Sequence, residues 1–146
     1  MSTNWRAAAG NITIRANDIT MTDEADIGSH TNNNGNIGGN IKITAADFLR
    51  MSDDTHIDAM TRGTNKKAGL VKITAGDIKM YDDATINVGT YTSPGESSGD
   101  GGEAIINAHT LTITNKADIF LLDGVCNPVR NVSWCFRKRK LKLCRC

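Results

Sequence analysis

Aromatic side chains are scarce in this chain, and cysteine is confined to one end of it. Phe, Trp and Tyr account for 5% of the 146 residues, so any core has to be built from Ile, Val, Leu, Met and Ala. All four cysteines lie between positions 126 and 146. The rest of the chain has no thiol for a disulfide or a metal site, and we expect the packing of apolar side chains to stabilise it without either.

Long apolar runs are absent as well. No stretch approaches the roughly 18 consecutive apolar residues of a membrane-spanning helix, so we expect no transmembrane segment. The N-terminal sequence MSTNWRAAAG lacks the basic start and the apolar stretch of a secretory signal. We therefore expect any export signal to lie outside this sequence.

Charge divides the chain into two parts. Residues 1–124 contain ten Lys and Arg against sixteen Asp and Glu, whereas residues 125–146 contain seven Lys and Arg and no acidic residue. This shift predicts a repeat domain over 1–124, followed by a basic, cysteine-containing tail over 125–146 that is either disordered or a cap.

A sequence pattern occurs four times in the first part. The copies are AGNITIRANDITMTDEADI from Ala9, GGNIKITAADFLRMSDDTHI from Gly39, AGLVKITAGDIKMYDDATI from Ala68 and GGEAIINAHTLTITNKADI from Gly101. Their equivalent glycines are spaced by 29, 30 and 33 residues: Gly10, Gly39, Gly69 and Gly102. A period of this length is typical of solenoids and other repeat arrays.

Within a copy, apolar and polar residues alternate. In the first copy Ile12 and Ile14 alternate with polar residues, as do Ile19 and Met21, and Ala25 and Ile27 flank Asp26 in the same way. A period of two predicts three short strands per copy, each with one buried face. Strands this short cannot bury that face alone, so the copies have to stack on one another.

Stacking in register predicts columns of equivalent side chains with a rise of about 4.8 Å per coil. The predicted columns are Ile12, Ile41, Val71, Ala104; Ile14, Ile43, Ile73, Ile106; Ala16, Ala45, Ala75, Ala108; Met21, Met51, Met80, Ile113; and Ile27, Ile57, Ile86, Ile119. The second copy has one additional residue near Phe48, which we interpret as a bulge or a corner insertion. The sequence thus predicts an all-β fold, a parallel β-helix of about four coils with three strands each.

The motif GGNIKITA, followed by an apolar-x-apolar strand, by DDATI and by a stretch rich in Gly, Asn and Ser, resembles the repeats of filamentous-haemagglutinin-type large exoproteins. The resemblance extends roughly from Gly10 to Gly124. It implies a right-handed β-helix, export by two-partner secretion, and adhesion at the bacterial surface. No amino-terminal secretion module of that family is visible and the coils are few, so we expect a fragment of a longer solenoid.

Three variable segments fall at the same place in successive copies. They are SHTNNNGNIG from Ser29, MTRGTNKKA from Met60 and GTYTSPGESSGDG from Gly89. We expect them to project from one side of the solenoid, either as a binding surface or as unconstrained excursions.

Acidic pairs recur at one corner of the first three copies, and the fourth copy has Asn115 and Lys116 there. The pairs are Asp23 and Glu24, Asp53 and Asp54, and Asp82 and Asp83. One interpretation is a weak cation site or a pair of carboxylates acting on a polysaccharide. The interpretation that we favour is turn chemistry, because Asp stabilises corners by bonding to nearby backbone amides.

Other polar residues give weaker signals. His30, His56 and His109 occupy different places in their copies, so they cannot form one column. Outward threonines raise the alternative of an ice-binding face, but Lys42, Lys72, Lys79 and Arg50 occupy matching positions and argue against it. The threonines are Thr13, Thr20, Thr22, Thr44, Thr74, Thr112 and Thr114.

The tail VCNPVRNVSWCFRKRKLKLCRC, from Val125, abandons the repeat. KLKLC alternates like a strand and could cover the edge of the last coil. RKRK could instead contact an anionic membrane or nucleic acid. A third interpretation is sequence appended by a truncated or frame-shifted gene, and disordered. The cysteine spacing matches no zinc signature.

Together these patterns predict a non-catalytic structural and interaction module of a secreted or surface-exposed bacterial adhesin. We expect no catalytic residue, metal ion or cofactor, and no nucleic-acid partner. The expected partners are a host or cell-surface glycan or protein, and neighbouring coils of a longer parent chain. The alternative is a β-helical polysaccharide-active enzyme or a fragment of an autotransporter passenger, since solenoids of this kind occur in both.

Overall fold

The computed structural model describes residues 9–31, 38–62, 67–91, 101–123, 136–137 and 140–142. Every regular element among them is a β-strand. The strands are β1 (Ile12–Met21), β2 (Asp26–Gly28), β3 (Ile41–Met51), β4 (His56–Arg62), β5 (Leu70–Thr74), β6 (Asp77–Met80), β7 (Thr85–Tyr91), β8 (Glu103–Asn107), β9 (Thr110–Ile113), β10 (Asp118–Asp123), β11 (Phe136–Arg137) and β12 (Lys140–Lys142). No helix in this described part is long and apolar enough to cross a membrane.

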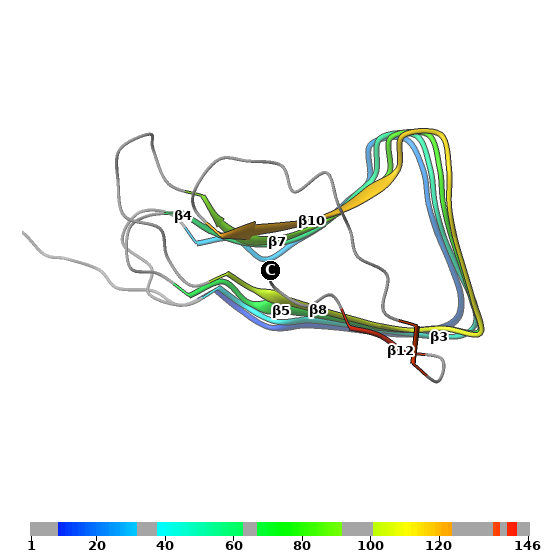
Figure 1. Ribbon diagram of the computed structural model, residues 1–146, viewed down its shortest axis with the longest axis horizontal. Helices are drawn as coiled ribbons and strands as arrows, with labels where there is room; N and C mark the ends of the chain where they lie inside the picture. The colour runs from blue at the N-terminus through cyan, green and yellow to red at the C-terminus, as the bar shows by residue number, and fades with distance from the viewer. Residues whose placement is uncertain are drawn as a thin grey trace, which may run out of the picture.

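The strands of the repeat form a solenoid with three faces, seen end-on in Figure 1. The first face contains the first half of β1, the first half of β3, β5 and β8. The second contains the remaining halves of β1 and β3 with β6 and β9, and the third contains β2, β4, β7 and β10. All these pairings are parallel. The predicted parallel β-solenoid is confirmed: the chain makes about three turns, and each face holds four stacked parallel strands. Its right-handed winding stays a prediction.

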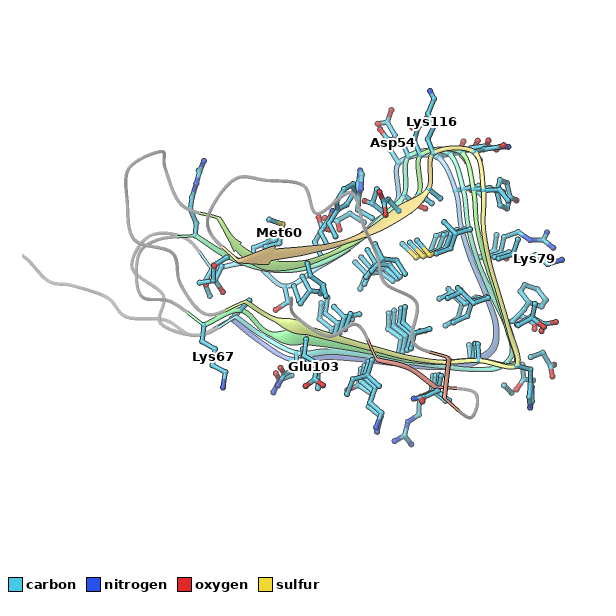
Figure 2. All side chains as sticks on the ribbon, in the orientation of Figure 1. Asp54, Met60, Lys67, Lys79, Glu103 and Lys116 are labelled. Carbon is cyan, nitrogen blue, oxygen red and sulfur yellow. The ribbon has the colours of Figure 1, made fainter. Side chains whose placement is uncertain are left out.

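The strand register confirms four of the five predicted columns in full, and the first pair, Ala16 and Ala45, of the alanine column. Ile14 pairs with Ile43, which pairs with Ile73, which pairs with Ile106. The methionine column and the column of Ile27 follow the same rule on the other two faces. Inside the triangle of Figure 2, equivalent side chains of successive coils lie directly over one another. Inward apolar residues of the two middle coils are fully excluded from solvent, including Ile43, Leu49, Ile57, Ile73, Ile78 and Ile86. Desolvation of these side chains stabilises the stack.

The extra residue in the second coil forms a bulge, which is one of the two predicted alternatives. The register between β1 and β3 shifts between Ala16 and Asp18, and Asp18 then pairs with Phe48. The next coil accommodates the bulge with a glycine, because a Cβ at Gly76 would overlap the carbonyl oxygen of Asp47.

The corner between the second and third faces is a left-handed turn in every coil. Its two residues have φ between 51° and 65° in all four coils: Asp23, Glu24, Asp53, Asp54, Asp82, Asp83, Asn115 and Lys116. The amide of Ala25 donates to the carbonyl of Thr22 across the turn, at 3.3 Å. Two successive positive φ angles define a type I′ turn, for which Asp and Asn are better suited than most residues.

Backbone hydrogen bonds also join the corners of adjacent coils. The amide of Glu24 donates to the carbonyl of Asp53 at 2.9 Å, and the amide of Asp54 donates to the carbonyl of Asp82 at 2.9 Å. The acidic pairs therefore form turns, as predicted, but the predicted hydrogen bonds from nearby backbone amides to the Asp side chains are replaced by other contacts. The corner amides bond to the next coil, and the Asp23 and Asp53 carboxylates accept from the hydroxyls of Thr22 and Ser52.

One buried hydroxyl interrupts an otherwise apolar column after this corner. The other three residues of the column are Ala25, Ala84 and Ala117, whereas the second coil has Thr55. Thr55 is fully buried and its Oγ1 has no hydrogen-bond partner. A buried hydroxyl without a partner loses its hydrogen bonds to water and forms none within the protein, so it lowers the free energy of unfolding.

We therefore expect Thr55→Val, which keeps the shape of the side chain, to raise the free energy of unfolding by about 1–2 kcal/mol. Urea denaturation at constant m-value measures this. Thr61→Val is the matched control, because the Thr61 hydroxyl is also buried but donates to the carbonyl of Lys67 at 3.2 Å. The control should lower stability, and equal shifts for the two variants would contradict the assignment.

Part of the basic tail lies at the edge of the last coil. β12 pairs antiparallel with β8, with Leu141 opposite Ile106, and β11 pairs antiparallel with β12. This is the edge at which a capping strand was predicted. The other residues of 125–146, the four cysteines among them, lie outside the described part of the chain.

Candidate functional site

The outward side of the third face carries side chains that do not repeat from coil to coil. One outward column contains Asp26, His56, Thr85 and Asp118, and the next contains Gly28, Asp58, Asn87 and Phe120. The strands β2, β4 and β7 hold these positions in register, and alternation along each strand points them away from the core. Polar residues of three consecutive coils are thereby placed side by side.

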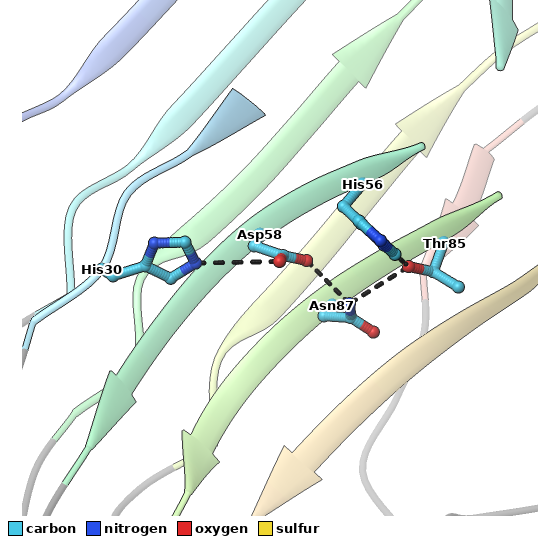
Figure 3. A network of polar contacts seen from close by, with 5 residues as sticks. All are labelled: His30, His56, Asp58, Thr85 and Asn87. Carbon is cyan, nitrogen blue, oxygen red and sulfur yellow. Dashed lines mark hydrogen bonds and ion pairs between the residues drawn. The ribbon is translucent and has the colours of Figure 1, made fainter. Parts of the chain in front are cut away.

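Three hydrogen bonds and one ion-pair contact link five side chains into one polar cluster, which consists of His30, His56, Asp58, Thr85 and Asn87 (Figure 3). Asn87 donates through Nδ2 to Asp58 Oδ1 at 2.7 Å and to Thr85 Oγ1 at 3.2 Å. Thr85 Oγ1 lies 2.7 Å from His56 Nδ1, and His30 Nε2 lies 3.7 Å from Asp58 Oδ2.

The carboxylate of Asp58 is at the centre of the polar cluster and has little access to water. Its side chain is 16% exposed, against 47% for His30. Desolvation by burial raises the pKa of Asp58 above its ordinary value, and the negative charge of Asp26 acts in the same direction. The hydrogen bond from Asn87 and the two neighbouring histidines oppose the increase.

The raised pKa of Asp58 predicts how its substitution depends on pH. The folded state binds the proton more tightly than the unfolded state, so the contribution of Asp58 to stability is present at low pH and falls as pH rises through the folded-state pKa. Asp58→Asn keeps an acceptor for Asn87 and removes the charge. We expect a higher melting temperature than wild type at neutral pH and no difference below the ordinary pKa of Asp.

Thermal unfolding followed by circular dichroism at several pH values measures this effect. Asp77→Asn on the exposed side of the second face is the matched control, and it should not show the gain at neutral pH. A gain for Asp58→Asn that persists in acid would contradict the electrostatic explanation.

The structure separates the three histidines that the sequence singled out. His30 and His56 lie on either side of Asp58, on neighbouring coils. His109 is exposed at the corner between the first and second faces, where its amide donates to the carbonyl of Gly76 at 2.7 Å. As predicted, the three histidines form no column. The carboxylate of Asp58 between two of them was not predicted from the sequence.

The acidic corner residues are exposed, and one of them contacts the polar cluster. His56 Nε2 lies 3.5 Å from Asp54 Oδ1. At the last coil Asn115 donates to Asp82 Oδ1 at 3.1 Å, and Lys116 Nζ lies 3.9 Å from Asp83 Oδ2. Within the described residues no group of three or more His, Cys, Asp or Glu side chains is placed to hold a metal ion.

The outward threonines do not form a regular face. Thr13 pairs with Lys42 and Lys42 with Lys72, while Thr20 pairs with Arg50 and Arg50 with Lys79. Cationic side chains therefore interrupt the threonine columns of the first and second faces. This agrees with the expectation that these threonines do not form an ice-binding face.

Within the variable segments, residues 32–37, 63–66 and 92–100 lie outside the described residues, but the positions at which the chain leaves the solenoid are defined. Thr31 bridges to Thr61, Arg62 pairs with Tyr91, and the amide of Gly38 donates to the carbonyl of Lys67 at 2.8 Å. All three segments therefore start and end at the edge between the third and first faces. Whether they bind a partner stays a prediction.

Asp58 and Asn87 were not identified from the sequence. Their signal is positional: they are outward residues of the third strand in the second and third copies, where the first copy has Gly28 and the fourth has Phe120. Comparison with known proteins gives no further guide, because no family model, curated protein or solved structure matches this chain.

Proposed function

We propose that this chain is a non-catalytic interaction module of a bacterial surface adhesin of the filamentous-haemagglutinin type. The solenoid serves as a rigid support, and its third face contacts a glycan or protein on another cell. The proposed location is the bacterial outer surface or the extracellular space, reached by two-partner secretion.

The polar cluster carries this proposal. The interior columns repeat from coil to coil, as the stability of a stack demands, whereas the cluster is assembled from residues that differ in each coil. His, Asp and Asn side chains provide the donors and acceptors that bind sugar hydroxyls. The cluster also lies near the edge at which the chain leaves the third face toward the first variable segment, since His30 directly precedes Thr31 there. Variable segments of repeat proteins often carry binding residues.

The test is capture of glycans and cells by the immobilised full-length chain. The double variant Asp58→Ala and Asn87→Ala removes two adjacent outward side chains of consecutive coils, and we expect capture to fall about tenfold. The matched control is Thr44→Ala and Thr74→Ala, which are register partners on the first face. Undiminished capture by the Asp58 and Asn87 variant would contradict the proposed surface.

A separate experiment distinguishes the polysaccharide-active alternative. The wild-type chain and the variants Asp53→Ala, Asp54→Ala, Asp82→Ala and Asp83→Ala are incubated with polysaccharides, and newly formed reducing ends are measured. The proposal predicts no cleavage by any of them. Cleavage that is lost in a folded carboxylate variant would overturn the non-catalytic assignment.

A further inference from the structure

The first coil ends in a surface that the described part of the chain leaves open. β1 pairs with β3 and β2 pairs with β4, and no described strand lies on their other edges. The first-coil isoleucines Ile12, Ile14, Ile19 and Ile27 are only partly buried, although their counterparts in the next coil are fully buried. Unpaired parallel edges with an apolar interior are a template for another strand layer.

Gly10 indicates what kind of layer fits this surface. In each later coil the equivalent glycine is required by the coil before it, since a Cβ would crowd or overlap the carbonyl oxygen of Gly10 at Gly39, of Gly39 at Gly69, and of Gly69 at Gly102. A Cβ at Gly10 would meet nothing within 4 Å. Gly10 therefore leaves the space that the glycine carbonyl of another such coil would occupy.

The charges at the corner between the second and third faces indicate which coil would dock on the first coil. Asn115 and Lys116 of the last coil already bond to the acidic corner residues Asp82 and Asp83 of the coil beside them. The first coil presents the same acidic pair, Asp23 and Glu24, on its open side. Placed in register against the first coil of a second copy, Lys116 would lie beside Glu24, with opposite charge, and Asn115 beside Asp23.

We propose that the open side of the first coil is a docking surface for the last coil of a second copy of this chain. The contact extends the solenoid head to tail, with the Gly102 carbonyl against Gly10. It is heterologous and does not close, so repetition produces a filament instead of a dimer.

β12 is the competitor for this contact, because it occupies the edge of β8 that the second copy needs. It makes three register pairs with β8, whereas the last coil makes five, four and six pairs with the coil before it on the three faces. A docked coil thus offers more strand pairing than the tail does. In this arrangement the tail limits the length of the assembly.

Sedimentation velocity of the full-length chain, with reductant to keep the tail cysteines reduced, tests the proposal over a range of protein concentrations. Leu141→Pro disrupts β12, because proline cannot donate from within a paired strand. We expect its weight-average mass to rise with concentration beyond that of a dimer. Adding Gly10→Val should return this variant to the monomer without changing its melting temperature at low protein concentration. Adding Glu24→Lys should weaken assembly.

Three outcomes would overturn the proposal. They are a Leu141→Pro chain that stays monomeric, a mass that stops at the dimer, and assembly that Gly10→Val leaves unchanged. A monomeric Leu141→Pro chain would mean that the open side of the first coil binds a coil of a different protein. A mass that stops at the dimer would mean that the first coils of two copies pack against each other. If Leu141→Pro does not fold, wild type and Gly10→Val are compared at the highest soluble concentration. A larger mass for wild type then supports the docking surface, and equal masses contradict it.

Discussion

Replacing Ile73 with Ala is expected to lower the free energy of unfolding by about 2–5 kcal/mol. Ile73 is fully buried in the third coil, and its neighbours in the column are Ile43 on one side and Ile106 on the other. The substitution loses the transfer free energy of the removed methyl and methylene groups. It also leaves a cavity between two coils whose spacing is fixed by strand hydrogen bonds, so the site cannot collapse easily.

Denaturant unfolding of the Ile73→Ala variant measures this loss. Thr74→Ala is the matched control, since Thr74 is the next residue of β5 and points to solvent. We expect the control to change the free energy of unfolding by less than about 1 kcal/mol. Similar losses at both positions would mean that Ile73 does not face a shared interior.

Adding a single methyl group at Gly69 is expected to destabilise the chain by about 1–3 kcal/mol or more. A Cβ at this position would overlap the carbonyl oxygen of Gly39 in the preceding coil, and neither backbone can move without disturbing the strands beside it. The reason is the close approach of two backbones, and not a left-handed conformation, because no positive φ is found at Gly69.

Gly10→Ala is the control for Gly69→Ala. Gly10 is the same position of the repeat in the first coil, and a Cβ there meets nothing. At low protein concentration its melting temperature should equal that of wild type, while that of Gly69→Ala should fall. A loss of stability in Gly10→Ala equal to that in Gly69→Ala would show that close approach of the backbones of adjacent coils is not the reason for glycine at this position.

The fold could be predicted in detail because the repeat encodes its own register. Once Gly10, Gly39, Gly69 and Gly102 are aligned, every inward residue lies over its counterpart, and the strand pairing follows this alignment. Alternation of apolar residues fixes which side of each strand is buried. Even the bulge at Phe48 was visible as an additional residue in one copy.

The polar cluster could not be predicted in the same way, because it depends on residues that break the repeat. Nothing in the sequence says that His30 reaches Asp58, since this contact depends on the course of the chain after Gly28. Hydrogen bonding of Asn87 to Asp58 depends on side-chain conformations that periodicity does not constrain. The corner was assigned to turn chemistry, but its left-handed conformation and its bonds to the adjacent coil appear only in three dimensions.

The most direct test of the stacked solenoid is a nuclear Overhauser experiment on the chain with labelled isoleucine methyl groups. We expect cross-peaks that connect Ile14 to Ile43, Ile43 to Ile73, and Ile73 to Ile106, because adjacent coils lie about 4.8 Å apart. Cross-peaks confined to isoleucines of the same repeat, with none between equivalent positions of successive repeats, would contradict the solenoid.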